Sequence, residues 1–182
     1  MLLTISGPST IGKDSTWLRE AENIGFCRVV PFTSRPIRKG EVDGRDYWFL
    51  TVEEFQRRIA AAEFCEWDFV LGHYYGSPVM LFEDAASGKD LVMQVLARMA
   101  VRLKGRLSHV FTVLLSTSDS AILNERLEAR GYFGAELILR NYHGQEELMH
   151  APLFDVVVPD ADIISHNDVL RVLTDITANR GN

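Results

Sequence analysis

Nine residues near the N-terminus have the composition and spacing of a loop that binds phosphate. They are Gly7-Pro8-Ser9-Thr10-Ile11-Gly12-Lys13-Asp14-Ser15, and they follow an apolar run and precede a segment with helical periodicity. Small residues let successive backbone N–H groups surround a phosphate, and the N-terminus of the next helix adds the positive end of its dipole. Lys13 would bring a mobile positive charge to the β- and γ-phosphates. The strand–loop–helix context therefore predicts a Walker A type nucleotide site rather than a glycine turn with a solvated lysine.

The position after this lysine departs from the usual pattern. A Ser or Thr that binds Mg²⁺ normally stands there, whereas this chain has Asp14, with Ser15 one position later. A carboxylate is a good Mg²⁺ ligand, so Asp14 is a candidate metal ligand. It could instead stabilise the helix N-terminus and weaken anion binding through its charge. The loop predicts ATP as phosphoryl donor with Mg²⁺ as cofactor, and leaves open how the metal is held.

The elements that must position this loop alternate between strands and helices. Predicted strands cover residues 2–6, 26–32, 91–95, 110–115 and 154–158, and predicted helices cover 15–24, 52–62, 119–129, 135–148 and 168–178. Such alternation predicts a parallel sheet with helices on both faces. The expected fold class is therefore α/β, a three-layer fold of the P-loop NTPase type.

Residues 33–77 differ in character from the chain around them. They are rich in Gly and aromatic residues and contain the predicted helix 52–62, which Thr51 could cap, with Glu54 completing a capping box. This composition indicates a smaller, partly β lobe inserted into the main domain. We expect one domain over 1–182, with its core at 1–32 and 81–182 and the inserted lobe at about 33–80.

Charge and composition exclude several function classes. The net charge of −6 argues against general nucleic-acid binding. No apolar run approaches the roughly 20 residues that span a bilayer, and the N-terminus has no secretory pattern. Cys27 and Cys65 have no metal-ligand spacing and are expected to be reduced. These features predict a cytoplasmic protein and leave its oligomeric state open. Clusters of arginines at 35–45 and 126–140 would suit a protein that binds small phosphorylated molecules, although composition alone favours ordinary solvated helix faces.

The predicted lobe carries an unusual string of residue types. It runs Ser34-Arg35-Pro36-Ile37-Arg38-Lys39-Gly40-Glu41-Val42-Asp43-Gly44-Arg45-Asp46-Tyr47, and is followed by Glu63-Phe64-Cys65-Glu66-Trp67 and Tyr74-Tyr75-Gly76-Ser77. With the phosphate loop, this pattern resembles the guanylate kinase family over about the first 80 residues. The resemblance resumes at Arg126 to Gly131 and at Phe154 to Val158, so it spans most of the chain.

The resemblance implies roles for named residues. The inserted lobe would bind the acceptor nucleotide, with arginine and tyrosine side chains on its phosphate and Glu66 on N1–H and the 2-amino group of guanine. The implied acceptor residues are Ser34, Arg35, Arg38, Tyr47, Glu66, Tyr75 and Ser77. A lid over about 126–145 would supply catalytic arginines to the moving phosphoryl group beside Lys13, and these are Arg126, Arg130 and Arg140.

The sequence also departs from that family. Gln94 and Leu96 occupy the positions of an Asp-x-Asp pair, and Pro31 replaces a hydroxyl residue. The Lys-Asp-Ser loop and the missing carboxylates resemble ribose 1,5-bisphosphate phosphokinase instead, whereas Glu66 favours a nucleotide acceptor. The leading hypothesis is ATP-dependent phosphorylation of GMP or a related purine monophosphate. The alternatives are a sugar-phosphate kinase and a non-catalytic binding module, although such modules typically lose the lysine and lid arginines that this chain keeps.

Overall fold

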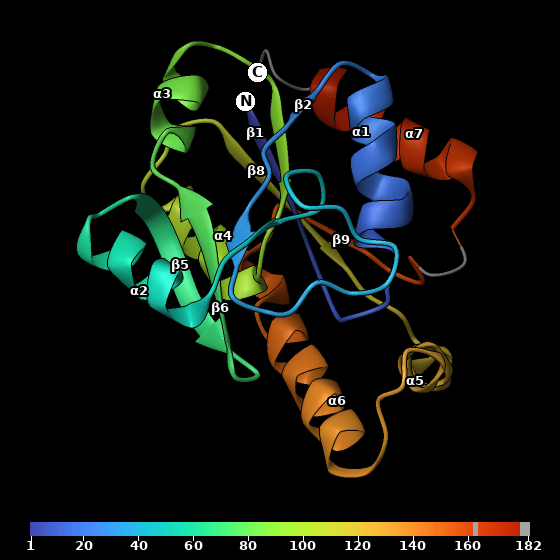
Figure 1. The fold of residues 1–182 in the computed structure, drawn as a ribbon. Coiled ribbons are helices and arrows are strands. Elements are labelled where there is room, and N and C mark those ends of the chain that lie inside the picture. The colour runs from blue at the N-terminus through green and yellow to red at the C-terminus, as the bar shows by residue number, and fades with distance from the viewer. Residues whose placement is uncertain (162–163, 179–182) are drawn as a thin grey trace.

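A parallel sheet of five strands forms the centre of the molecule. The computed structural model describes residues 1–161 and 164–178, with the backbone alone for Asp14 and Ser15. In spatial order the strands are β2 (Cys27–Arg28), β7 (Leu91–Gln94), β1 (Leu2–Ser6), β8 (Val110–Leu115) and β9 (Val156–Val158). The central strand β1 pairs in parallel with β7 and β8 (Figure 1). The carboxyl ends of these strands therefore meet at one edge, where the phosphate loop follows β1.

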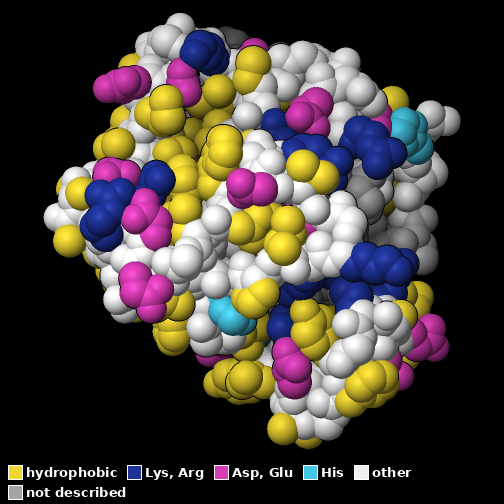
Figure 2. All heavy atoms as spheres, in the orientation of Figure 1, with side chains coloured by type: hydrophobic (Ala, Val, Ile, Leu, Met, Phe, Trp, Pro, Cys, Tyr) yellow, Lys and Arg dark blue, Asp and Glu magenta, His cyan; other side chains and the backbone are white. Residues whose placement is uncertain are grey.

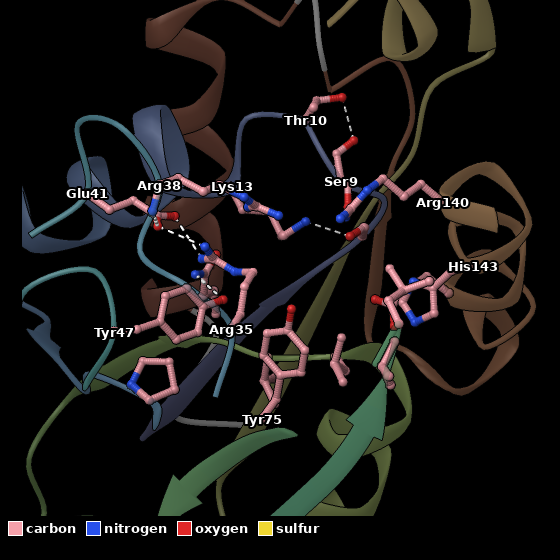
Figure 3. A pocket seen from close by; sticks show the side chains of 18 of the residues that line it. Ser9, Thr10, Lys13, Arg35, Arg38, Glu41, Tyr47, Tyr75, Arg140 and His143 are labelled. Atoms are coloured by element: carbon pink, nitrogen blue, oxygen red, sulfur yellow. Dashed lines mark hydrogen bonds and ion pairs between the residues drawn. The ribbon is translucent and has the colours of Figure 1, made fainter. Parts of the chain in front are cut away.

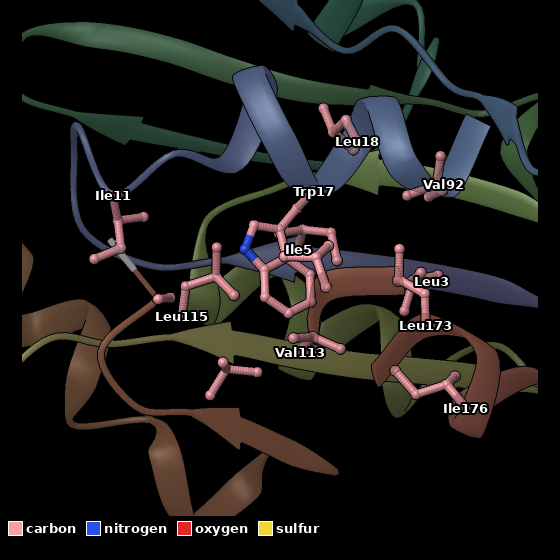
Figure 4. Packing of buried hydrophobic residues seen from close by; sticks show 14 of the residues in the cluster. Leu3, Ile5, Ile11, Trp17, Leu18, Val92, Val113, Leu115, Leu173 and Ile176 are labelled. Atoms are coloured by element: carbon pink, nitrogen blue, oxygen red, sulfur yellow. The ribbon is translucent and has the colours of Figure 1, made fainter. Parts of the chain in front are cut away.

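Alternate residues of the central strand face two separate apolar layers. Leu3 and Ile5 join side chains of β8 in one buried cluster, whereas Leu2 belongs to a second cluster on the other face. This period of two is expected where both faces of a sheet are covered. Trp17, which has no exposed surface, fills the middle of the first cluster and packs the segment after the phosphate loop onto the sheet (Figure 4).

Helices cover both faces of the sheet and confirm the predicted three-layer α/β fold. One face carries the π-helical segment η1 (Lys13–Leu18), α1 (Arg19–Asn23) and α7 (His166–Ala178), and the other carries α3 (Leu81–Ala86) and α4 (Ala97–Lys104). Beyond the sheet, α5 (Ser120–Ala129) leads into α6 (Gly134–Leu148), followed by a short 3₁₀ turn at Ala151–Leu153 (Figure 1). Within the described ranges, no helix combines the length and apolar character needed to cross a bilayer.

A second sheet of four strands lies beside the first. Its order is β4 (Trp48–Phe49), β3 (Phe32–Thr33), β6 (His73–Pro78) and β5 (Phe64–Val70), and α2 (Val52–Ala60) packs on it. Thr51 Oγ1 accepts from the Glu54 amide at 3.1 Å, so the predicted cap is confirmed. The Glu54 carboxylate accepts hydrogen bonds from Arg57 and Arg58. A capping box would require it to accept from the Thr51 amide instead, so the predicted capping box does not form.

The prediction of one strand over residues 26–32 is wrong. Cys27 and Arg28 pair with β7 in the five-stranded sheet, whereas Phe32 and Thr33 pair with β4 and β6 in the second sheet. Pro31 has no N–H to donate to a ladder, and it lies where the chain leaves one sheet for the other. The apolar character of this segment could not show that its two ends serve different sheets.

The boundaries of several helices also differ from the expected ones. The helix after the phosphate loop begins at Lys13 with a π turn rather than at residue 15, and α7 begins at His166 rather than at 168. The short helices α3 and α4 were not predicted. Both contain few residues, so neither gives a long periodic pattern.

Candidate active site

A cavity of about 690 Å³ lies where the phosphate loop, the second sheet and α6 meet. Basic side chains gather around the hollow on this face of the molecule (Figure 2). Those that line the cavity are Lys13, Arg35, Arg38, Lys39, Arg130 and Arg140. In the close view, Lys13 lies between Arg35 and Arg38 on one side and Arg140 on the other (Figure 3). Such a convergence of cations suits ligands that carry several phosphate charges.

The phosphate loop is held in shape by its glycines and by its own lysine. Gly7 has φ +140°, and a Cβ added there would lie 2.5 Å from the Leu115 carbonyl oxygen, so only glycine fits. Gly12 has φ +101° directly before the helix. Lys13 Nζ donates to the carbonyl oxygens of Gly7 at 2.6 Å and Pro8 at 2.7 Å. The ammonium group therefore lies over the loop, at the mouth of the cavity.

Arg35, which lines the cavity next to the second sheet, is held by hydrogen bonds to two neighbouring residues. Its guanidinium donates to both carboxylate oxygens of Glu41, at 2.8 and 2.9 Å, and to the Pro36 carbonyl at 2.8 Å. Burial alone would raise the pKa of Glu41, but the hydrogen bonds from Arg35 and from the Arg38 amide lower it overall. Glu41 thus stays ionised and fixes Arg35 at the cavity wall.

Two tyrosines continue this wall toward the five-stranded sheet. Tyr47 and Tyr75 meet edge to face at 6.2 Å, and Gln94 Nε2 donates to the Tyr47 hydroxyl at 2.7 Å. Ser77 beside them is completely buried, and its Oγ has no hydrogen-bond partner among the described residues. A buried hydroxyl without a partner is costly. Since this hydroxyl has no exposed surface, it could bond a polar ligand at this end of the cavity only after a small shift of the wall around it.

The Glu66 carboxylate is turned toward α4 rather than toward the cavity. Its carboxylate is nearly buried and accepts from Arg102 Nε at 2.6 Å and from Arg106 at 2.7 Å. Among the described residues, those that line the cavity include its ladder partner Ser77 but not Glu66. Each carboxylate oxygen of Glu66 accepts a hydrogen bond from an arginine. A guanine base could therefore reach this carboxylate only if one of the two arginines moved.

The predicted lid arginines occupy three different environments. Arg140 is buried, pairs with Glu136 at 2.9 Å, and its guanidinium lies 3.6 Å from the centre of the Tyr132 ring. Arg130 lines the cavity. Arg126 donates to the Thr10 carbonyl at 3.2 Å and thus contacts the phosphate loop from α5.

The structure places the other predicted site residues as follows. Ser9, Thr10 and Gly12 line the cavity, whereas the Ile11 side chain is buried in the core. Ser34 Oγ accepts from the Tyr74 amide at 2.9 Å. The side chains of Asp14 and Ser15 lie outside the described part of the structure, as does Asp162 of the segment 159–162 that follows β9.

Comparison with known proteins shows the family. The sequence profile of guanylate kinase matches residues 1–176. The chain belongs to the guanylate kinase family. It is 39% identical to a guanylate kinase of Gloeobacter violaceus over 85% of this chain and 77% of that one. It is 34% identical to one of Symbiobacterium thermophilum over 95% and 83% of the two chains.

A solved guanylate kinase has the same fold. The match to the crystal structure of guanylate kinase from Anaplasma phagocytophilum covers 100% of this chain and 87% of the solved chain. Its TM-score is 0.76, at 24% sequence identity. The predicted family and fold are therefore confirmed, and this chain is an enzyme of the nucleoside monophosphate kinase class.

The structure of this chain also places residues at the cavity that sequence reasoning did not assign. These are chiefly Glu41, Tyr132, His143 and Glu147. Tyr132 accepts from Arg38 Nε at 3.0 Å and so joins the acceptor side to the segment before α6. Glu41 stood inside the string that carried the resemblance, and its spacing from Arg35 could have suggested a pair. No local signal marks His143 or Glu147, because their positions depend on how α6 packs.

The described residues do not build a metal site of their own. No group of three or more His, Cys, Asp or Glu side chains in the described part of this kinase could hold a metal ion. Gln94 bonds Tyr47, and Leu96 gives the cavity an apolar wall. The carboxylates of Glu41 and Glu147 at the cavity are both already bound to N–H donors.

Proposed function

We propose that this kinase transfers the γ-phosphoryl group of ATP to GMP, giving ADP and GDP. One observation carries the proposal: Lys13 on its phosphate loop lines the same cavity as Arg35 and Arg38 (Figure 3). In-line transfer requires a donor and an acceptor phosphate held at a fixed separation, with cations around the moving group. A pocket with a phosphate-binding loop at one side and bidentate arginine donors at the other meets that requirement.

The roles that we propose follow the two sides of the cavity. The phosphate loop binds the ATP phosphates, and Arg35, Arg38, Tyr47 and Tyr75 bind the acceptor phosphate with charged and neutral donors. Arg126, Arg130 and Arg140 approach from α5 and α6, the proposed lid at about 126–145, and stabilise charge on the phosphoryl group in transit. The second sheet belongs to the proposed acceptor lobe. Nucleotides are thus the proposed substrates, and the cytoplasmic location stays a prediction from the sequence.

A panel of acceptors tests this proposal directly. ADP release would be measured with GMP, dGMP, AMP, IMP and ribose 1,5-bisphosphate as acceptors. We expect GMP to give the highest kcat/KM. A preference for ribose 1,5-bisphosphate would favour the sugar-phosphate alternative, and ATP binding without turnover on any acceptor would favour a binding module.

The guanine end of the site yields a prediction about Glu66. We propose that Glu66 accepts hydrogen bonds from guanine after Arg102 or Arg106 gives way. Glu66→Gln should then raise the KM for GMP about 10- to 100-fold, since a hydrogen bond to a charged group contributes about 1.5–3 kcal/mol. The ratio of kcat/KM for GMP over AMP should fall with it.

A neighbouring residue provides the control for this substitution. Asp68 on the same strand also pairs with Arg102 and with Arg98, so Asp68→Asn weakens the same contact between β5 and α4 without touching the proposed base contact. Its GMP over AMP ratio should stay at the wild-type value. If both variants lose the same stability and keep that ratio, Glu66 has a structural role only.

The metal yields a second prediction, about Asp14. Mg²⁺ would neutralise charge on the β- and γ-phosphates when bound with ATP. Since the described residues supply no metal site, we propose that the phosphates, water and Asp14 hold it. Asp14→Ser should then raise the Mg²⁺ concentration for half-maximal activity several-fold and lower turnover. A Mg²⁺ titration that matches wild type, or tighter ATP binding, would show that Asp14 acts only on the helix N-terminus.

A further inference from the structure

A buried carboxylate at the end of α6 joins three elements of the site. Glu147 is only 5% exposed. Both of its oxygens lie 3.0 Å from the Ala97 amide at the start of α4, and the Gly7 amide at the start of the phosphate loop lies close enough to lower its pKa. One side chain thus connects the helix that carries Arg140, the loop that carries Lys13, and α4.

The start of α4 needs such a partner. Its N-terminal flanking residue is Leu96, which offers no side-chain acceptor, so the Ala97 amide has none from within its own helix. A carboxylate at a helix N-terminus accepts a hydrogen bond from this amide and also interacts favourably with the helix dipole. Glu147 does this from another helix, so α4 and α6 are linked at the cavity wall.

The first residue of the phosphate loop is held from both sides. The Gly7 amide faces Glu147, and the Gly7 carbonyl oxygen accepts from Lys13. One turn earlier in α6, Gly144 packs on the next loop residue, because a Cβ added to Gly144 would lie 3.4 Å from Pro8 Cβ. Helix α6 therefore lies directly against the loop over residues 144–147.

The same face of α6 looks into the cavity. Arg140, His143 and Glu147 are spaced by three and four residues, and all three line it. Residues at this spacing share one face of a helix. Figure 3 shows Arg140 and His143 on the far side of the cavity from Tyr47. The position of Arg140 relative to the phosphate loop is thus set by a helix that Glu147 attaches to that loop.

We propose that Glu147 is a positioning residue that fixes the phosphate loop against α6. It thereby fixes the position of Lys13 relative to Arg140, so that both can contact the phosphates of one bound nucleotide. The inference rests on the proposed function in taking ATP as the donor. It does not depend on which acceptor is phosphorylated.

The charges around Glu147 predict how pH affects this contact. Burial raises its pKa, although the charge of Lys13, the amides of Ala97 and Gly7 and the charge of His150 oppose the rise. Glu147 is therefore protonated at a higher pH than an ordinary glutamate, and the neutral carboxyl is a weaker acceptor for these amides. His143, which also faces the cavity, has a pKa lowered by burial, with Arg98, Lys13 and Arg140 adding to the effect and Glu146 opposing it.

The test compares Glu147→Gln with Glu146→Gln, a matched change at the exposed neighbouring position. ATP affinity is measured by calorimetry without an acceptor, and kcat and KM are then measured with GMP. We expect Glu147→Gln to weaken ATP binding and lower kcat by about tenfold or more each, because small misplacements of reacting groups are costly. The KM for GMP should change less than twofold. Glu146→Gln should match wild type in all three.

A pH series separates positioning from a general loss of structure. As pH is lowered from 8 toward the acid limit at which the protein stays folded, the ATP affinity of wild type and of Glu146→Gln should approach that of Glu147→Gln, because a growing share of Glu147 becomes neutral. The titration of ATP itself is common to all three proteins and cancels in the ratio. A ratio that stays constant over this range would overturn the proposal, as would tighter ATP binding by Glu147→Gln, since the carboxylate would then only repel the phosphates.

A second variant keeps the proposal testable if Glu147→Gln does not fold. Even a Cβ at Gly144 would already be in van der Waals contact with Pro8 Cβ, at 3.4 Å, so the longer side chain of Gly144→Leu would push α6 away from Pro8 while leaving the carboxylate in place. It should weaken ATP binding several-fold at unchanged KM for GMP. Wild-type ATP affinity in a folded Gly144→Leu protein would show that the contact between α6 and the loop does not position the donor site. If no acceptor is turned over but these ATP affinities behave as expected, the proposed function fails and the inference stands.

Discussion

Replacing Lys13 with alanine is expected to reduce phosphoryl transfer by a factor between about 10² and 5 × 10³ while the protein stays folded. Lys13 Nζ already donates to the carbonyl oxygens of Gly7 and Pro8, so its ammonium group is held over the loop where phosphates would lie. A fixed donor that stabilises charge developing in the transition state contributes about 3–5 kcal/mol. Single-turnover rates with saturating ATP and GMP would measure this loss apart from product release.

A surface lysine offers the control for this experiment. Lys89 is exposed and pairs only weakly with Asp84, as exposed pairs generally do, so Lys89→Ala should keep the wild-type rate. Thermal unfolding of both variants would show whether the fold is intact. Lys13→Ala with near wild-type turnover would mean that the loop from Gly7 to Ser15 does not bind the donor phosphates.

The features that sequence reasoning predicted well are local ones. The phosphate loop depends on neighbouring residues: a strand that ends at Ser6, glycines at set spacing, and a helix that follows. Thr51 caps α2 for an equally local reason, since its acceptor and the Glu54 amide lie three residues apart. Such patterns carry their own geometry, so no knowledge of the rest of the fold is needed.

The features that were missed depend on contacts between distant parts of the chain. Glu66 and Arg102 are 36 residues apart, and nothing near Glu66 indicates that α4 would place an arginine on it. Glu147 and Ala97 are 50 residues apart, and their contact depends on the angle at which α6 crosses the start of α4. The split of residues 26–32 between two sheets has the same origin, because it depends on which strands lie alongside each half.

Local pairing of side chains explains how a net acidic protein can gather several cations at one cavity. Many basic side chains of the cavity are paired with acidic or aromatic partners, as Arg35 is with Glu41 and Arg140 is with Glu136 and Tyr132. Such partners hold cations in place and reduce their mutual repulsion. The net charge of −6 therefore says little about the local potential at the site.

Arg35 should be the residue whose loss most weakens acceptor binding. Arg35→Ala would remove a bidentate donor from the acceptor side and leave the Glu41 carboxylate facing the incoming phosphate with its main partner gone. Removing one partner of a buried charge pair costs about 2–5 kcal/mol. We expect the KM for GMP to rise about 10²- to 10³-fold and the free energy of unfolding to fall, with ATP affinity nearly unchanged.

A double-mutant cycle with Glu41→Gln separates the two parts of this effect. Glu41→Gln removes the partner but keeps Arg35, so it should cost stability and raise the KM for GMP far less than Arg35→Ala does. The pKa of Glu41 is lowered in the folded protein, so the pair stabilises the fold above the ordinary glutamate pKa of about 4.3 and loses this effect as pH falls below it. The stability difference between wild type and Arg35→Ala should therefore shrink at acid pH. If Arg35→Ala lowers stability but leaves the KM for GMP near the wild-type value, Arg35 serves only to hold Glu41, and the acceptor phosphate must be bound by Arg38 and the tyrosines instead.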